Sequence, residues 1–315
     1  MTRCLSRMGL LLAGAALVVV GVAAAANPVA IKTSPRNEVR PAAGGDWLVW
    51  SESRAGRSGT FDLWAQRENV APIRVNPPGT RAYAGGIDGT SLVYQLVRGQ
   101  RSDLRIYDLA RGTHRRVPTG FNTRAWEWHP TLSDVWMLFA RGRPFARGVQ
   151  MIVLRHLVTG EQRVLDRLRN RRGVLAPGQV QGSFAAWMRC NPHPRCRIVR
   201  YEITTRATVA LPVPAGKVVY GPAVDASGTA YYARSGRGCG NGVELVKHPL
   251  GSSPQVLATL PRGEALKFPY AVLARAKPRP PLEPSIVQVY YDRVVCRRNT
   301  WDIYRVDDIV QPPLP

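Results

Sequence analysis

The sequence predicts an all-β protein, a six-bladed β-propeller whose blades are four-stranded antiparallel sheets. Three observations carry this prediction. A short strand-like phrase ending in an aromatic ring returns six times, glycine and proline interrupt the whole chain, and no strong helix signal is present. The phrases end at Trp50, Tyr94, Phe139, Trp187, Tyr232 and Tyr291. Most of these ends lie about 45 residues apart, a period typical of one propeller blade.

Runs rich in Val, Ile, Tyr, Trp and Thr predict the strands within each repeat. Turn residues such as Gly112 and Gly160 separate the last two strands of a repeat. The chain contains 29 Gly and 26 Pro, too many for long helices to persist. In the first five repeats we expect strands at 46–52, 61–66, 72–76; 91–97, 104–109, 114–117; 134–140, 150–157, 162–165; 184–188, 197–203, 208–211; and 229–233, 243–248, 255–260.

The sixth repeat is incomplete. It contains strands at 286–291 and 301–306, and then the chain ends in a Pro-rich tail at 311–315, where no further strand is expected because proline lacks the ladder donor. Residues 28–35 resemble the missing outer strand. We expect this N-terminal strand to complete the last blade and close the ring, leaving no open sheet edge. The Pro-rich segment from Lys277 to Pro284 is expected to form an exposed loop.

Residues 1–26 have the pattern of a secretory signal peptide, followed by one propeller domain at 27–310. Arg3 and Arg7 precede an apolar run from Met8 to Ala23, and small residues follow at the cleavage position. The alternative is an uncleaved membrane anchor, although the run is close to the lower length limit for spanning a bilayer. We therefore expect a secreted protein, or one of the periplasm or cell envelope.

The chain is strongly basic, with a formal net charge of +23. Only five of its 44 basic residues are lysine, so 39 are arginine. Two interpretations remain open: a surface that attracts polyanions, or an arginine-rich composition inherited from a GC-rich genome. The arginines are scattered through all six repeats, which favours the second. The expected secretion argues against nucleic acid as a partner.

Four cysteines follow the signal segment: Cys190, Cys196, Cys239 and Cys296. An even number in a secreted chain predicts disulfides, and we expect the pairs Cys190–Cys196 and Cys239–Cys296. The second pair would join equivalent loops of adjacent blades. The alternative is a zinc site formed by Cys190, His193 and Cys196 with a fourth ligand such as Cys239, but thiolate ligands require reducing conditions. We expect no metal and no cofactor.

Two further groups are candidates for a binding face. Glu127, flanked by Trp126 and Trp128, either faces the central channel as a ligand contact or belongs to the core between blades. Arg141, Arg143 and Arg147, near one loop of the third repeat, either form a basic rim or a solvated loop. The Gly-rich segment 236–242 is interpreted as a flexible loop, because no helix follows it as a phosphate-binding fingerprint requires.

Part of the chain resembles the TolB-like propeller family. The resemblance rests on Ile31–Glu38, on Gly44–Gly56, which ends in Ser-Glu-Ser-Arg-Ala-Gly, and on Asp62-Leu-Trp64; Asp103–Tyr107 and Trp301–Tyr304 repeat the last element. It covers nearly all of 28–308 and implies the six-bladed fold. The founding protein of that family carries an α/β domain before its propeller, for which this sequence has no room, so its envelope role is not implied here.

The expected function is a non-enzymatic binding or scaffolding module, acting as a monomer on a protein or an anionic envelope polymer. The alternatives are a propeller enzyme acting on extracellular glycans or small molecules, and an adhesin for anionic cell-wall polymers. A catalytic propeller is expected to focus several carboxylates in its channel. Asp and Glu total only 21 here and form no repeated carboxylate motif, which favours binding. No catalytic residues are assigned.

Overall fold

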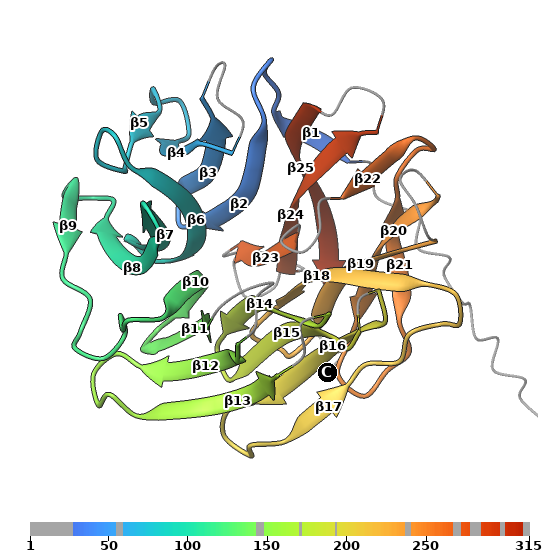
Figure 1. Cartoon of the computed structure of the whole chain (residues 1–315). Helices are drawn as coiled ribbons and strands as arrows, with labels where there is room; N and C mark the ends of the chain where they lie inside the picture. The colour runs from blue at the N-terminus through green and yellow to red at the C-terminus, as the bar shows by residue number, and fades with distance from the viewer. Residues whose placement is uncertain are drawn as a thin grey trace, which may run out of the picture.

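The computed structural model describes residues 28–54, 59–142, 148–169, 172–192, 194–236, 241–266, 272–277, 285–296 and 300–310. These residues form β-strands and turns, and the strands make six antiparallel sheets that stand as blades around a ring (Figure 1). No helix in this part of the chain is long and apolar enough to cross a bilayer. The predicted six-bladed architecture is confirmed.

In blades one to five the strands follow in chain order from the axis outward, and we label these four positions A to D. The A strands are β2 (Glu38–Gly44), β6 (Arg81–Asp88), β10 (Trp126–Ser133), β14 (Val174–Gln181) and β18 (Val218–Val224). The B strands are β3 (Trp47–Ser53), β7 (Ser91–Arg98), β11 (Trp136–Gly142), β15 (Phe184–Cys190) and β19 (Ala230–Ser235). The C strands are β4 (Phe61–Arg67), β8 (Arg101–Asp108), β12 (Gln150–His156), β16 (Cys196–Glu202) and β20 (Val243–His248). The D strands are β5 (Ile73–Arg74), β9 (Thr113–Arg115), β13 (Gln162–Leu168), β17 (Thr208–Ala210) and β21 (Gln255–Thr259).

Blade six is completed by the N-terminal strand, as expected. Its D strand is β1 (Val29–Lys32), which pairs antiparallel with the C strand β25 (Thr300–Val310), so the two lie side by side in Figure 1. The hydrogen bonds of this pairing close the ring. They also cover the edge that β25 would otherwise expose.

Blade six also departs from the expected pattern in two ways. Its B strand β24 (Ser285–Val295) and its C strand have 11 residues each, longer than the segments 286–291 and 301–306 expected from the sequence. Its A position is divided between β22 (Glu264–Leu266) and β23 (Val272–Lys277), which both pair with β24. Lys277 ends β23, and the rest of the expected Pro-rich loop, 278–284, lies outside the described residues.

The aromatic ends of the six phrases fill the cores between blades. Each of them is at most 1% exposed. Trp50 packs with Tyr290 and Ile303 of blade six, and the other five likewise pack against the blade that precedes them in the ring: Tyr94, Phe139, Trp187, Tyr232 and Tyr291. Truncating such a ring to alanine costs about 3–5 kcal/mol. The repeat in the sequence therefore arises because one large aromatic ring is buried at each blade interface.

The A strands share a second feature, a bulge near their middle. All five continuous A strands shift register there, at dipeptides rich in Gly and Pro. The bulges bring neighbouring backbones very close together. A Cβ added to Gly178 would lie 2.1 Å from the carbonyl oxygen of Pro222 in the next blade, and one added to Gly85 would lie 2.3 Å from that of Pro130. Glycine is therefore required at these two positions.

Candidate functional site

The two faces of the propeller are made by different connections. Because the four strands of a blade alternate in direction, the B–C hairpins and the links from D to the next A strand emerge on one face, which we call the B–C face. The A–B and C–D turns emerge on the opposite face. Every exposed loop residue can thus be assigned to one face from the strand order alone.

Exposed charges are distributed unequally between these two faces. Within the described residues, ten exposed arginines lie on the B–C face, at hairpin tips and in D–A links: Arg36, Arg98, Arg101, Arg116, Arg124, Arg169, Arg172, Arg195, Arg197 and Arg262. All four exposed acidic residues of the described chain lie in A–B or C–D turns, on the other face: Asp46, Glu68, Asp134 and Glu161. Six further exposed arginines lie at C–D turns or on D strands: Arg67, Arg74, Arg111, Arg115, Arg167 and Arg206. The exposed acids are therefore confined to one face, and most exposed arginines lie on the other.

The B–C face also lacks exposed apolar side chains in the part of the chain that the structure describes. The exposed large hydrophobic residues lie on D strands or in C–D turns: Val29, Val70, Ile73, Val158, Val164, Val209, Leu250 and Val256. Acidic side chains near this face are only partly exposed and are bound to arginine, as in Arg234–Glu244 at 2.5 Å and Arg36–Glu52 at 2.7 Å. The face is thus basic and polar, with little opposite charge.

Glu127 and Arg141 form a buried ion pair rather than a surface. They lie opposite each other in β10 and β11, and Arg141 Nε donates to Glu127 Oε1 at 3.0 Å. Glu127 is 0% exposed and Arg141 8%. Arg141 also donates to the carbonyl oxygens of Gly120 and Phe121. Burial raises the pKa of Glu127, and Thr123 and Arg141 partly offset this. The pair anchors the link into blade three instead of presenting charge to a ligand.

The other residues of these candidate groups are distributed differently. Trp128 is buried in the core between blades three and four, and the partly buried Trp126 packs against the same core. This is the core alternative weighed from the sequence. Arg143 and Arg147 lie outside the described residues.

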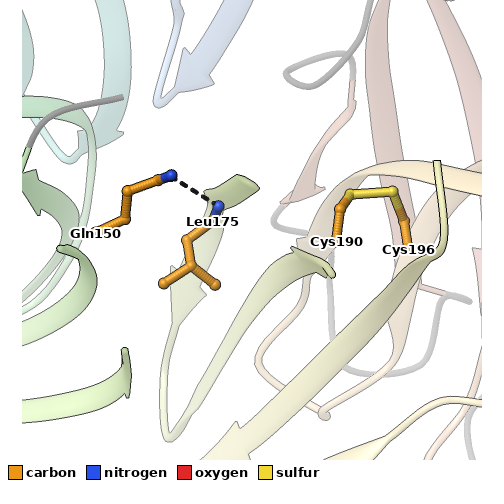
Figure 2. Close-up of a disulfide and its surroundings, with 4 residues drawn as sticks. All are labelled: Gln150, Leu175, Cys190 and Cys196. Carbon is orange, nitrogen blue, oxygen red and sulfur yellow. Dashed lines mark hydrogen bonds between the residues drawn. A yellow bond between two sulfur atoms is a disulfide. The ribbon is translucent and has the colours of Figure 1, made fainter. Parts of the chain in front are cut away.

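The cysteine loop of blade four lies on the B–C face. A disulfide joins Cys190, at the end of β15, to Cys196, at the start of β16, and closes this hairpin (Figure 2). Neither sulfur is therefore available as a thiolate for zinc. Among the described residues no group of three His, Cys, Asp or Glu side chains is placed to hold a metal ion. Cys296 is also disulfide-bonded, and its expected partner, Cys239, lies outside the described residues.

Beside this hairpin, a buried amide fixes the link from blade three into blade four. Gln150, 2% exposed, accepts a hydrogen bond from the backbone N–H of Leu175 at 3.0 Å (Figure 2) and donates one to the carbonyl of Gly173 at 3.0 Å. The two bonds satisfy backbone groups at the start of β14 that the ladder leaves unpaired. They hold this part of the B–C face in place.

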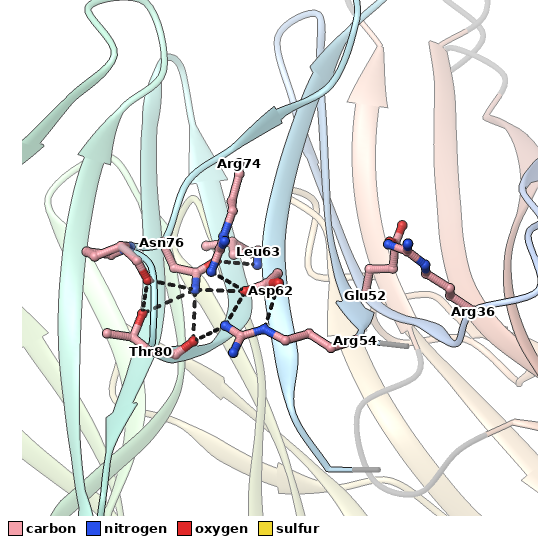
Figure 3. A network of polar contacts seen from close by, with 9 residues as sticks. Arg36, Glu52, Arg54, Asp62, Leu63, Arg74, Asn76 and Thr80 are labelled. Atoms are coloured by element: carbon pink, nitrogen blue, oxygen red, sulfur yellow. Dashed lines mark hydrogen bonds and ion pairs between the residues drawn. The ribbon is translucent and has the colours of Figure 1, made fainter. Parts of the chain in front are cut away.

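The polar motif that carries the family resemblance is structural. Asp62 in β4 accepts hydrogen bonds from Arg54 at 2.8 and 2.6 Å, from Arg74 at 2.7 Å and from Asn76 at 3.2 Å (Figure 3). Burial raises the pKa of Asp62, but the hydrogen bonds and the two guanidinium charges outweigh it and hold that pKa below its usual value. Asn76 also accepts from the backbone of Leu63. The motif thus ties together β4, β5, the residue that follows β3 and the link out of blade one.

Near the axis, the bulges bring together polar groups that the sequence did not single out. The Arg40 guanidinium lies 4.2 Å from the centre of the Tyr83 ring, and its backbone N–H faces Asp292 of blade six at 3.5 Å. His129 is buried, and burial together with the charge of Arg40 lowers its pKa well below the usual value. This cluster has one buried carboxylate. An equivalent bond, from the backbone of Ala84 to Ser51 at 2.8 Å, links blades one and two, so Asp292 serves the same blade-to-blade contact.

Comparisons with known proteins find the fold but no family. No family profile matches the sequence, and no curated protein matches it. Among solved structures, TolB from Acinetobacter baumannii is similar with a TM-score of 0.54 and 12% identity, over 85% of this chain and 65% of that one.

This chain aligns with a larger share of two further solved structures. A putative TolB from Agrobacterium tumefaciens has a TM-score of 0.54 and 12% identity, over 88% of this chain and 92% of that one. An oligogalacturonate lyase in complex with manganese has a TM-score of 0.53 and 13% identity, over 88% and 90%. At such identities the likeness concerns architecture only. The chain therefore has a TolB-like six-bladed β-propeller fold.

Proposed function

We propose that this protein is a secreted, non-enzymatic binding module of the cell envelope or extracellular space, and that it binds its partner through the B–C face. The observation that carries the proposal is the unequal distribution of exposed charge: within the described residues, ten exposed arginines and no exposed acid lie on that face, whereas all four exposed acids lie on the other. A face of one sign focuses the electrostatic field and speeds encounter with an oppositely charged partner.

The architecture suits this role. Loops carried by a rigid scaffold are the usual place for binding residues, and here the blade cores fix the hairpins that bear the arginines. The Cys190–Cys196 disulfide closes one such hairpin. A disulfide is also what an oxidising compartment permits, which supports secretion together with the signal-like segment at 1–26.

The enzyme alternative receives less support from the described residues. The oligogalacturonate lyase shares the fold, but one fold hosts many functions. The axial groups Arg40, His129 and Asp292 make contacts between blades. A single buried carboxylate there provides no acid–base pair of the kind that glycoside chemistry uses.

The test compares two variants with the same change in net charge. The face variant carries Arg98→Gln, Arg101→Gln and Arg195→Gln, all exposed on the B–C face. The control variant carries Arg111→Gln, Arg115→Gln and Arg206→Gln, from two C–D turns and the D strand β9. Wild-type protein and both variants are incubated with washed envelopes of the producing cells and sedimented. We expect the face variant alone to lose retention; equal retention of all three proteins would overturn the proposal.

A further inference from the structure

Building on the proposed function, we propose that the ligand of the B–C face is a linear acidic polysaccharide that lies along an arc over blades two to four. The basic arc consists of seven exposed arginines. It runs from the β7–β8 hairpin tip through the β9–β10 and β13–β14 links to the β15–β16 hairpin: Arg98, Arg101, Arg116, Arg124, Arg169, Arg195 and Arg197.

The charge of the basic arc is available to a ligand. None of its seven arginines forms an ion pair with another described residue. Arg98 and Arg101 face each other across the hairpin, where like charges repel. This pairing of like charges is unfavourable for the isolated protein, and a bound anion would relieve the repulsion.

A protein partner fits this surface poorly. Protein interfaces depend on a few buried aromatic or aliphatic anchors surrounded by a polar rim. The described part of the B–C face exposes no large hydrophobic side chain; these lie on the D strands and in the C–D turns. The described part of the B–C face therefore resembles the polar rim of a protein interface without its apolar centre.

Nucleic acid is disfavoured by a related argument. Single-stranded nucleic acids are held by stacking their bases on exposed aromatic rings, as well as by charge. No Trp, Tyr or Phe side chain in the described part of the chain is exposed; Trp126 and Trp301, near this face, are only partly so. A ligand that presents charge and hydroxyl groups, without bases to stack, matches the surface better.

The spread of the arc requires a polymer rather than a small anion. An exposed charge pair contributes little by itself, so a single carboxylate or phosphate held by one arginine would bind weakly. The arginines sit on four separate connections of three blades, so that only an extended chain reaches several of them at once and gains from multivalency. Arginine also matches a carboxylate with two parallel hydrogen bonds, a geometry that lysine lacks.

The experiment uses alginate, a linear polyuronate, and its propylene-glycol ester, which has the same backbone with most carboxylates neutralised. Binding of the wild-type, face and control proteins is measured by isothermal titration calorimetry at low salt and at about 0.15 M salt, where charges are screened beyond about 8 Å. We expect the wild-type and control proteins to bind alginate and not the ester. The face variant should bind about tenfold more weakly, from three lost exposed contacts, and salt should weaken all binding.

A second arm separates this inference from the proposed function. Envelopes are digested with protease before the sedimentation assay. Face-dependent retention that survives digestion and is competed by alginate supports a polysaccharide. Face-dependent retention that is abolished by protease, or tighter binding to duplex DNA than to alginate, overturns the inference while the B–C face remains the binding surface. Retention that does not depend on the face overturns both.

Discussion

Replacing Asp62 with alanine should destabilise the propeller by about 3 kcal/mol. The carboxylate accepts four hydrogen bonds, three of them from guanidinium groups. Breaking a fully buried ion pair costs about 3–5 kcal/mol, and an exposed pair contributes about 0–1 kcal/mol. The side chains of Asp62, Arg54 and Arg74 are 12%, 23% and 31% exposed. After the substitution, water therefore solvates part of the two unpaired guanidinium groups, which places the cost at the lower end of the range for buried ion pairs.

Blade two provides a matched control at the same position of the repeat. Asp103 precedes Leu104 as Asp62 precedes Leu63, and both leucine N–H groups donate to an asparagine at 2.7 Å. The Asp103 side chain, however, is 33% exposed, and its one ion-pair partner among the described residues is Arg105, at 3.8 Å. Asp103→Ala should therefore cost no more than about 0.5 kcal/mol.

Urea unfolding followed by tryptophan fluorescence measures the stability of both variants. Their denaturation midpoints are compared at a constant dependence of the free energy of unfolding on urea concentration. Because the pKa of folded Asp62 lies below its ordinary value of 3.8, its contribution is complete above that pH. It is lost as the pH falls through the lower pKa of the folded state. Equal losses for Asp62→Ala and Asp103→Ala at pH 7 would refute the assignment of the stabilisation to the network in Figure 3.

Three further predictions concern other parts of the molecule. His129 is held neutral in the folded protein, so the free energy of unfolding should fall as the pH drops below 6.5, the ordinary pKa of histidine, by at most about 1.4 kcal/mol per pH unit. His129→Asn, which tolerates the positive φ of this position, should reduce this pH dependence in urea titrations. An unchanged pH dependence contradicts the assignment. Replacing Cys190 and Cys196 together by serine removes a closed loop of sequence separation six and should cost about 2 kcal/mol in the chain-entropy model, read as a lower melting temperature; no change would mean that the hairpin is equally ordered without the bond. Peptide mapping without reduction should recover Cys239 linked to Cys296, and Cys239→Ser should expose one new thiol to alkylation; any other partner for Cys296 contradicts the predicted pairing.

The fold was open to prediction because its signal is local and repeated. Every blade has a strand that ends in a buried aromatic ring. Trp50, Phe139 and Tyr232 show why this ring recurs: each fills the gap to the preceding blade. Closure by residues 28–35 was also predictable, since a blade without its outer strand leaves an open edge. The split A strand of blade six was not, because three residues of β22 are too short to register as a repeat element.

The candidate site was harder to predict, because it depends on partners that are distant in sequence. Glu127 and Arg141 are 14 residues apart, and only the register of β10 on β11 makes them a pair. From the sequence both were candidates for a binding face, whereas burial assigns them to the core. Arg40, His129 and Asp292 come from blades one, three and six, and nothing in their local sequence indicates that they lie close together near the axis.

The sequence by itself determined the number of blades, the strands within them and the place where the ring closes, because these follow from short-range periodicity and from the need to pair every edge. It also determined the net charge, but left its arrangement open. Only the tertiary structure decided which arginines are neutralised inside and which face solvent together. Strand alternation sends every B–C hairpin and every D–A link to the same face, so that residues spread over the whole chain become neighbours on one surface.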